Sequence, residues 1–353
     1  MGRSLTYAGA GVSLEASDDV VRRIAGAVRS TRRPEVIGDL GGFAGLFALP
    51  TRRFRHPVLV ASTDGVGTKA QLAAVTGRYD TIGIDLVAMC ADDVVCAGAE
   101  PLFLLDYLAV GRVDPARVEA VVRGVADGCR EAGMALLGGE VAEHPGETGL
   151  DLAGTAVGVA ERDALVGPEQ VRPSDRLIGL ASSGLRSNGY SLARQALLEV
   201  AGRSLDGPAW SGASHSLADE LLRPSVIYAP AVVAAMAAGG VHAAAHITGG
   251  GIPGNLVRVL PPTCDAVIDP GRWEVPRVFE EVQRAGAIDV EEMTRVFNLG
   301  IGMILVVDAG RAEEVVTILD TRGHRAWNVG EVVPGEGSVR FDPRVTIGAA
   351  EPG

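Results

Sequence analysis

The sequence predicts an α/β protein, of the mixed α+β type, with two domains. Strand-like and helix-like segments alternate in both halves of the chain, which is typical of domains in which helices cover a sheet. The length of 353 residues is enough for two hydrophobic cores. A polar segment with two prolines, residues 161–176, separates the two alternating units. We therefore expect domains at residues 1–165 and 174–345, with a long surface loop inside one domain as the alternative.

The first domain is predicted to contain apolar strands that alternate with helices. The helices are indicated by apolar residues that recur about every 3.6 residues. Pro115 at a first-turn position and Gly133 mark the two ends of one predicted helix. The predicted strands are 58–62, 102–110, 134–138 and 150–160, and the predicted helices are 69–77, 82–97 and 115–132.

The second domain repeats this alternation, although the pattern does not determine the order of the strands in a sheet. The predicted strands are 176–182, 242–250 (which runs into a glycine turn) and 302–308, and the predicted helices are 187–202 and 311–323.

Composition and charge narrow the class of function. Hydrophobic residues make up 47% and charged residues 22%, which suits a soluble globular protein. A net charge of −12 argues against a nucleic-acid partner, because phosphate backbones attract basic surfaces. No apolar run approaches the roughly 20 residues of a membrane-spanning helix, and residues 1–12 lack the apolar core of a secretory signal, so we expect a cytoplasmic protein without a membrane partner.

The segment 62–69, STDGVGTK, lies where a predicted strand meets a predicted helix. Glycines at such a point let backbone N–H groups approach phosphate oxygens. Asp64 could hold a magnesium ion there, and Lys69, the single lysine among 31 arginines, could neutralise a transferring phosphoryl group. The spacing differs from that of a Walker A loop. A tight turn with a solvated Asp and Lys is the alternative.

The predicted helix at 82–97 carries Asp85, Asp92 and Asp93 among apolar residues. At 100° per residue, Asp85 and Asp92 point within about 20° of each other, with Asp93 about 80° to one side. Buried carboxylates need a counter-charge, which favours a divalent cation; a solvated helix face paired with arginines is the alternative. Glu140, after the turn of Gly138 and Gly139, is a further candidate ligand.

Three other segments suggest phosphate or substrate contacts. The glycine-rich segment 38–45 could cover a polyphosphate, or could be a mobile hairpin. Segment 182–191, SSGLRSNGYS, places hydroxyls, an amide and Arg186 before a helix, which suits a monoester phosphate. His246 precedes Thr248 and a triple glycine, and could be a general acid–base or a satisfied core residue.

Taken together and in order, these motifs resemble those of the phosphoribosylformylglycinamidine cyclo-ligase (AIR synthetase) family. The resemblance runs from about residue 5 to 332 and rests on TRRPEV, GGFAGLFALP, STDGVGTK, DTIGIDLVAM, GAEPLFLLDYLAVG, GGEVAEHPG, SSGLRSNGYSLAR, HITGGG and FNLGIGM. It implies two α/β domains. The N-terminal domain would form a β-barrel-like dimer interface, and the C-terminal domain would be a mixed sheet covered by helices.

The resemblance also implies an activity, which is the ATP-dependent cyclisation of formylglycinamidine ribonucleotide to 5-aminoimidazole ribonucleotide, with ATP and Mg²⁺ as cofactors and a homodimer as the assembly. A non-catalytic or specialised nucleotide-binding paralogue of the same superfamily is the alternative. The expected catalytic residues are Lys69, Asp92, Asn188 and His246. The expected ATP-binding residues are Gly41, Gly42, Phe43, Asp64, Gly65, Gly67, Thr68 and Lys69. The expected substrate-binding residues are Arg186, Ser187, Asn188, Gly189, Thr248, Gly249 and Gly250, and the expected metal ligands are Asp64, Asp93 and Glu140.

Four positions depart from the pattern of that family. Ser13 stands where the family usually has Asp, Ala25 where it often has Lys, Val141 where it has Thr, and Arg186 where it has His. These departures leave Asp64, Lys69, Asp93 and Glu140 in place, but they leave room for a specialised relative.

Overall fold

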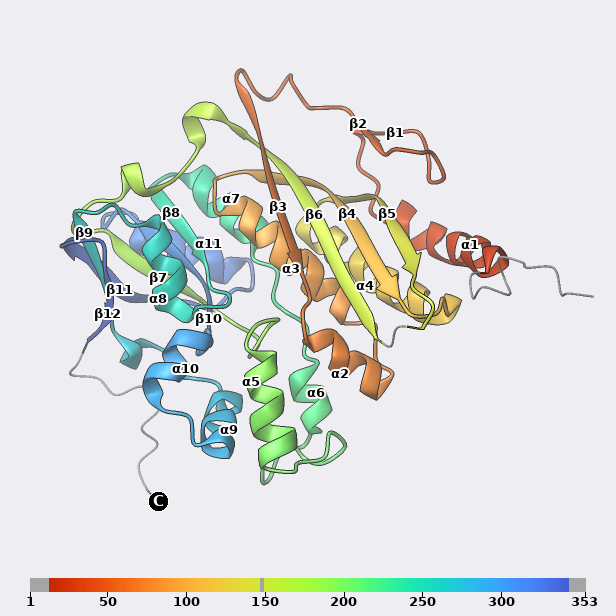
Figure 1. Cartoon of the computed structure of the whole chain (residues 1–353). Helices are drawn as coiled ribbons and strands as arrows, with labels where there is room; N and C mark the ends of the chain where they lie inside the picture. Colours follow the sequence, from red (N-terminus) through yellow and green to blue (C-terminus); the bar gives the residue numbers. More distant parts are fainter. Residues whose placement is uncertain (1–12, 147–148, 343–353) are drawn as a thin grey trace, which may run out of the picture.

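The computed structural model describes residues 13–146 and 149–342, which form two α/β units, each built on its own sheet (Figure 1). The mixed α/β class predicted from the sequence is confirmed. The outer ends of the predicted domains, residues 1–12 and 343–345, lie outside the described part of the chain. Between the sheets, residues 162–175 contain two 3₁₀ turns, Arg162–Ala164 and Pro168–Gln170, and no strand.

The first unit contains a four-stranded sheet in the order β3-β6-β4-β5. The pairs β3–β6 and β4–β6 are antiparallel, while β4–β5 is parallel. Helices α3 and α4 cover one face of the sheet, and α1 packs on α4 (Figure 1). The elements are α1 (Leu14–Ser30), β1 (Val36–Ile37), β2 (Leu46–Phe47), β3 (Pro57–Gly65), α2 (Lys69–Thr76), α3 (Ile82–Val95), β4 (Glu100–Val110), α4 (Pro115–Ala132), β5 (Ala135–Glu143) and β6 (Leu150–Glu161).

Local sequence signals explain these helices and their close packing. Asp114 accepts hydrogen bonds from the first amides of α4, Pro115 follows it, and Gly133 ends the helix with a positive φ of 71°. Glycines Gly83 and Gly124 face each other where α3 crosses α4, and a Cβ on either would collide with the backbone of the other helix or of the turn before α3. This close approach places α3, with its three aspartates, directly under the sheet.

The second unit contains a six-stranded sheet in the order β12-β9-β11-β7-β10-β8, antiparallel except for the pair β12–β9. It is the mixed, helix-covered sheet that the resemblance implies. The strands are β7 (Arg176–Ala181), β8 (Val241–His246), β9 (Cys264–Ile268), β10 (Ile301–Val307), β11 (Ala326–Pro334) and β12 (Val339–Phe341). The helices are α5 (Tyr190–Arg194, continuing as a π-helical turn over Gln195–Val200), α6 (Leu217–Leu221), α7 (Ala229–Ala238), α8 (Gly251–Leu256), α9 (Arg277–Gly286), α10 (Val290–Val296) and α11 (Ala312–Thr321).

Most of the predicted elements are confirmed to within a few residues. The predicted strand at 134–138 continues to Glu143, and the predicted strand at 242–250 ends at His246 because the glycine turn begins there. Helices α1 and α9 were not predicted, although both are strongly amphipathic. The other elements that were not predicted are helices α6, α7 and α10 and strands β1, β2, β9, β11 and β12.

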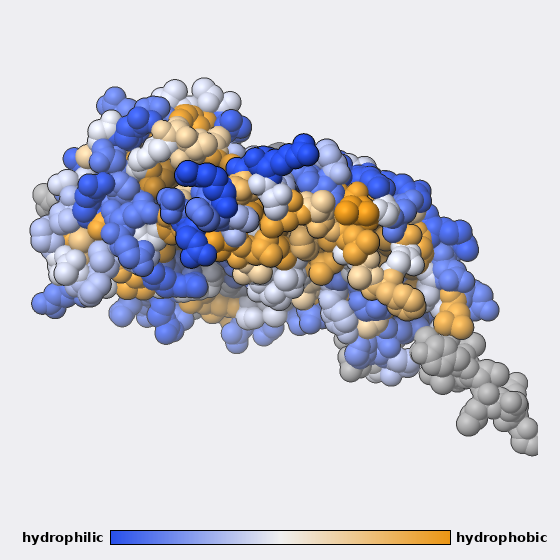
Figure 2. Space-filling model, turned by 90° about the horizontal axis from the view of Figure 1, so that it is seen from above, coloured by the Kyte–Doolittle hydropathy of each residue, from blue (hydrophilic) through white to orange (hydrophobic). Residues whose placement is uncertain are grey.

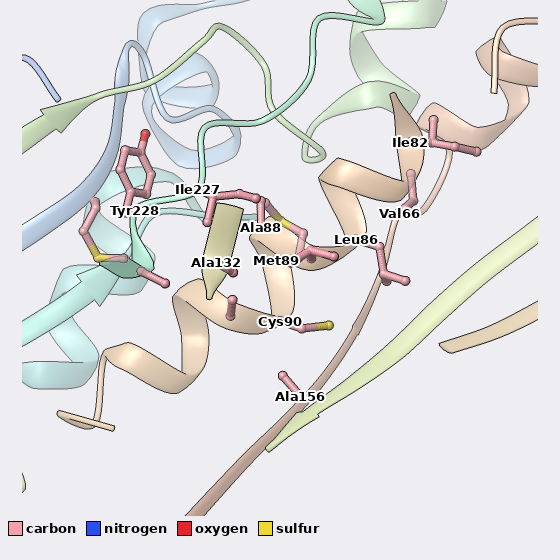
Figure 3. Close-up of a cluster of buried hydrophobic side chains, with 14 of the residues drawn as sticks. Val66, Ile82, Leu86, Ala88, Met89, Cys90, Ala132, Ala156, Ile227 and Tyr228 are labelled. Carbon is pink, nitrogen blue, oxygen red and sulfur yellow. The ribbon is translucent and has the colours of Figure 1, made fainter. Parts of the chain in front are cut away.

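The largest hydrophobic core is shared between the two units. Its buried residues come from α3 and α4 as well as from the segment before α7 and from β10. Figure 3 shows Ile227 and Tyr228 of the second unit beside Ala88 and Met89 of α3. Helix α3 therefore belongs to the core of the first unit and also to the junction with the second.

The outer face of the four-stranded sheet carries apolar side chains that no helix of the described chain covers. Leu59, Leu105 and Tyr107 are 60%, 40% and 44% exposed. Figure 2 shows hydrophobic surface gathering over the half of the molecule that holds this sheet. In one chain the sheet is open, so the barrel-like dimer interface stays a prediction. Among the described residues, no helix combines the length and the apolar character that crossing a membrane requires.

Candidate functional site

The end of β3 and the middle of α3 bring two carboxylates together. Ser62 and Asp64 lie on the face of β3 that packs on α3, and Ser62 Oγ donates to Asp93 Oδ2 at 2.8 Å. Asp64 accepts a hydrogen bond from the amide of Gly65 at 2.7 Å. Burial and the nearby charge of Asp93 raise the pKa of Asp64. Two neighbouring half-buried carboxylates form a site of negative potential, which the charge of Arg258 offsets in part at Asp93.

His246, at the end of β8, connects Asp93 to the second unit. Its Nδ1 lies 2.8 Å from Asp93 Oδ1, and its Nε2 lies 2.7 Å from Arg186 Nη1. A guanidinium can only donate, so Nε2 accepts, and Nδ1–H donates to Asp93. Burial and the charge of Arg186 lower the pKa of His246 to about 4, although Asp93 opposes this. Burial acts to raise the pKa of Asp93, but the His246 and Ser62 donors hold it below its usual value.

Arg186 is only 2% exposed and lies between the two units. Besides His246, its guanidinium donates to Asp92 Oδ2 at 2.9 Å and to the carbonyls of Val226 and Gly302 at 3.1 Å. Its Cζ lies 4.8 Å from the ring centroid of Tyr228. With these contacts Arg186 joins α3 to the second sheet. Arg186 was expected to bind substrate, but its N–H donors are buried in these contacts and are not exposed to a ligand.

The other aspartates of α3 are paired with protein cations and amides. Asp92 Oδ1 accepts from the amides of Tyr228 and Ala229 at 2.8 and 3.0 Å. Asp85 accepts from the amide and hydroxyl of Ser225 and forms an ion pair with Lys69. The counter-charges of Asp85 and Asp92 are therefore lysine and arginine, within the core. Asp93 is the aspartate of this helix that is partly exposed to solvent, with 36% of its side chain accessible. Asp92 itself is buried and bonded to Arg186 and two amides, so its expected catalytic role stays a prediction that would act through these partners.

Lys69, at the start of α2, is fully buried. Its Nζ lies 2.7 Å from Asp85 Oδ2 and donates to the carbonyls of Arg186 at 3.0 Å and Arg223 at 2.7 Å. An ammonium group has three N–H donors, so all of them are used. Contact between Lys69 and a phosphoryl group, as expected from the sequence, would require breaking one of these bonds.

Three loops meet next to the Asp64–Asp93 pair. Thr68 Oγ1 lies 3.3 Å from Ser191 Oγ, and a Cβ on Gly249 would lie 3.9 Å from Asn188 Nδ2. The Oγ of Ser187 is buried and has no hydrogen-bond partner within the described residues. The structure thus brings together these expected residues: Asp64, Gly65, Gly67, Thr68, Asp93, Ser187, Asn188, Gly189, His246, Thr248, Gly249 and Gly250. We call this group the interdomain cleft.

The remaining expected residues lie elsewhere, around a cavity of about 1050 Å³. The cavity lies between α1, the loop from Asp39 to Leu49 and the β4–β5 edge of the sheet. Gly41, Gly42, Phe43 and Glu140 line it, as does Val141, one of the departures from the family pattern. We call it the edge cavity.

Glu140 is separated from Asp64 and Asp93 within one chain. The sheet register runs Gly65–Ala153–Tyr107–Glu140, so Glu140 lies three strands from β3, about 14 Å at 4.8 Å per strand. Alternation along the strands also places it on the opposite face from Asp64. Within one chain, therefore, Asp64 and Asp93 do not meet Glu140, and the expectation that all three hold one ion stays a prediction. The position of a residue at the end of a predicted strand does not reveal on which face of the sheet its side chain lies.

Asp106 was missed in the sequence analysis. It lies in the middle of β4, lines the edge cavity, and pairs in register with Gly139 of β5. A charged residue within the apolar strand segment LFLLDYLAV was the signal that could have found it, because such a residue must be paired or functional.

A second cluster, Asp175, His242 and Asp308, has ligand-type atoms within 4.8 Å of one another. His242 Nδ1 already lies 2.8 Å from Asp175 Oδ2, and Arg172 lies 3.1 Å from Nε2. The adjacent guanidinium opposes a metal cation, so these three residues are better explained as an ion-pair network.

Comparison with known proteins gives a consistent result. The family models described as AIR synthase related protein, N-terminal domain and C-terminal domain, match residues 51–160 and 172–342. The chain is 50% identical over 331 residues to the phosphoribosylformylglycinamidine cyclo-ligase of Citrifermentans bemidjiense, covering 93% of this chain and 95% of that protein. It is 49% identical to the enzyme of the same name from Sorangium cellulosum, over 98% and 100% of the two chains.

Solved structures with the same fold are more distant in sequence. Thiamine-monophosphate kinase from Stenotrophomonas maltophilia matches with a TM-score of 0.67 at 17% identity, covering 91% of this chain and 96% of that chain. The hydrogenase maturation protein HypE, solved in complex with ATP, matches with a TM-score of 0.66 at 19% identity, covering 94% and 92%. At 17% and 19% identity, the similarity to these structures shows a shared fold and carries no conclusion about activity.

Proposed function

We propose, since the chain belongs to the AIR synthase related family, that it catalyses the ATP-dependent ring closure of formylglycinamidine ribonucleotide to 5-aminoimidazole ribonucleotide, a step of purine biosynthesis in the cytoplasm. The observation that carries this proposal is the 50% identity over 93% of the chain to a cyclo-ligase, together with an interdomain cleft that holds a carboxylate pair and converging phosphate-type loops.

The chemistry explains why such a cleft is needed. An amide oxygen is a poor leaving group, so the γ-phosphoryl group of ATP is first transferred to the formyl oxygen, which gives an iminophosphate and ADP. The amidine nitrogen then attacks the formyl carbon, the C–O bond breaks, and phosphate leaves. Holding both reactants in one cleft makes the attack effectively unimolecular.

Asp64 and Asp93 fit a magnesium ion. Both are half-buried carboxylates, and the Ser62 and His246 donors favour the ionised form of Asp93. Hard oxygen donors of this kind are the ligands that Mg²⁺ prefers. When bound, the ion would offset the negative charge of the nucleotide phosphates.

The other residues of the cleft orient the reactants. His246 is held between Arg186 and Asp93 with both ring nitrogens used, so its proposed role is to position Asp93 rather than to exchange protons with substrate. Ser187 Oγ has no hydrogen-bond partner among the described residues, and Asn188 follows it in the same loop. Both are therefore proposed to contact the substrate phosphate. The amides of Gly189, Thr248, Gly249 and Gly250 are proposed to act with them.

A homodimer would unite the cleft with the edge cavity. The exposed apolar face of the four-stranded sheet is a surface that a second sheet could cover. When two such sheets close a barrel around a two-fold axis along the barrel, the β5 edge of one protomer adjoins the β3 edge of the other. The glycine-rich loop and Glu140 of one protomer would then lie near Asp64 and Asp93 of its partner, which explains why these groups are apart in one chain.

The assay for the activity is direct. Purified protein is incubated with ATP, Mg²⁺ and formylglycinamidine ribonucleotide, and the expected products are ADP and an aminoimidazole ribonucleotide that couples with a diazonium salt. Product no greater than in a no-enzyme control would refute the cyclo-ligase assignment. ATP binding in the absence of turnover would instead favour a non-catalytic paralogue, which the departures at Ser13, Ala25, Val141 and Arg186 motivate. Ser13, however, still caps α1 by accepting from the amide of Ala16.

A further inference from the structure

The edge cavity differs from the interdomain cleft in its lining. Its walls are mostly aliphatic, and its lining residues include no Lys, Arg or His. Its polar side chains are Ser17, Asp39, Asp106 and Glu140. At about 1050 Å³ it is large enough for a ligand of nucleotide size. A cavity of this kind suits a neutral, planar, hydrogen-bond-donating group better than an anion.

Asp106 projects into this cavity because Gly139 has no side chain. The two residues face each other across the β4–β5 pair. A Cβ on Gly139 would overlap Oδ1 of Asp106, so the carboxyl group occupies the space that a side chain at position 139 would fill. The glycine in the edge strand thus gives the partly buried carboxyl group of Asp106 access to the cavity.

Asp106 also differs from the other acidic residues nearby, because no side chain in the described part of the protein forms a hydrogen bond or ion pair with it. Asp39 is paired with Arg29 at 3.2 Å, and Glu143 accepts from the amide of Val113 at 2.7 Å. Burial raises the pKa of Asp106 to about 7, and only its own amide opposes this. A desolvated carboxyl group without a counter-charge destabilises the fold, so its presence in a cavity indicates a ligand contact.

We propose that Asp106 accepts a hydrogen bond from the exocyclic amine of adenine, and that it selects ATP among the nucleoside triphosphates. Val20 and Ile24 of α1, with Val122 and Leu136, provide apolar walls for the planar ring. The phosphates would extend towards the backbone amides of Gly41 and Gly42, which also line the cavity. This inference rests on the proposed function, since it takes ATP as the nucleotide.

Inosine triphosphate is the sharpest probe, because it replaces the exocyclic amine by a carbonyl oxygen and leaves the rest of the ring system largely unchanged. That carbonyl oxygen would face the Asp106 carboxylate, and because both groups are acceptors no hydrogen bond would form between them. A hydrogen bond to a charged group corresponds to a discrimination of about 10- to 100-fold. We therefore expect wild-type protein to bind ATP at least about tenfold more tightly than inosine triphosphate.

The experiment measures displacement of a fluorescent ATP analogue by ATP and by inosine triphosphate. Asp106→Asn keeps the size of the side chain, but its amide can accept from adenine or donate to inosine, so the discrimination should fall to about threefold or less. Glu131→Gln is the control, because Glu131 is an exposed acid that lies outside the cavity lining. It should leave the ratio of the two affinities unchanged.

Gly139→Ala tests the same contact while keeping the carboxyl group of Asp106. The added methyl group would displace that carboxyl group from its position in the cavity. Equal affinity of wild-type protein for the two nucleotides, or an unchanged ratio in Asp106→Asn, would overturn the inference. Binding is measured without the ribonucleotide substrate, so the result stands even if the turnover assay gives no product. Conversely, turnover with equal use of both nucleotides would leave the cyclo-ligase proposal intact and remove the role of Asp106.

Discussion

Lys69 Nζ lies 2.7 Å from Asp85 Oδ2, and neither side chain is exposed to solvent. The ammonium also bonds two carbonyls, of Arg186 and Arg223, so it connects α2 and α3 of the first unit to two loops of the second. A compact ammonium can donate in three directions at one point, whereas a planar guanidinium cannot. This geometry accounts for a single lysine in a chain with 31 arginines.

Replacing Lys69 by Met tests this structural role. The substitution leaves Asp85 buried without its counter-charge, so we expect a loss of about 3–5 kcal/mol in the free energy of unfolding. Chemical denaturation measures it. The control is Arg78→Met, which breaks a 2.7 Å ion pair with Asp219 that is more than 40% exposed on both sides, and should change stability by less than about 1 kcal/mol. If the Lys69→Met protein has normal stability but no turnover, the result would instead support contact between Lys69 and the transferring phosphoryl group.

Replacing Arg186 by Met should loosen the junction between the two units. Burial raises the pKa of Asp92, and the substitution removes its guanidinium partner and the donor to His246. We expect a loss of about 3–5 kcal/mol in stability, because Asp92 stays buried without its guanidinium partner. We also expect a fall in kcat, because His246, which bonds Asp93, is no longer held in place by Arg186. The matched control is Arg203→Met, which breaks a partly exposed pair with Glu281. If kcat stays normal at a temperature where the Arg186 variant is folded, Arg186 does not position Asp93.

Asp64→Asn should separate catalysis from stability. The carboxylate is proposed to hold Mg²⁺, so kcat should fall at least about 100-fold, with half-maximal activity shifted to a higher Mg²⁺ concentration. The melting temperature should stay equal or rise, because burial and Asp93 disfavour the Asp64 charge. Asp163→Asn, in an exposed 3₁₀ turn, is the control. Normal turnover in Asp64→Asn at low Mg²⁺ would remove Asp64 from the metal site.

The sequence predicted the two sheets, most of their strands and the segments of the interdomain cleft, because periodicity and glycine turns are local signals. It could not distinguish the three aspartates of α3, since a helical wheel gives directions but not the neighbours that fill them. Asp92 and Asp93 differ by one position, yet one meets Arg186 and the other meets Ser62 and His246. The face occupied by Glu140 depends on pairing with Tyr107, a non-local contact that no local pattern contains.

Asp106→Asn should stabilise the protein in a pH-dependent way. Burial raises the pKa of Asp106 from 3.8 to about 7, so between these values the folded state binds more protons than the unfolded state. Stability therefore falls as pH rises through this window, and the Asn variant escapes that loss. We expect a gain on the order of 1–3 kcal/mol at pH 8 and little change at pH 4, measured by denaturant unfolding at both values. An equal change at both pH values would mean that the carboxyl group is not desolvated.

Mixing two inactive variants tests whether the edge cavity and the interdomain cleft of different protomers form one site. Asp64→Asn alters the cleft and Glu140→Gln alters the cavity, so each homodimer should be inactive. In a mixed dimer, one composite site carries both substitutions and the other carries neither. Random reassociation of equal amounts makes half of the dimers mixed, so about a quarter of wild-type activity should return. Mixing Asp64→Asn with Asp93→Asn is the control, because both lie in the cleft and every site stays altered. Recovery in neither mixture would show that each protomer acts alone, and the barrel arrangement would lose its functional support.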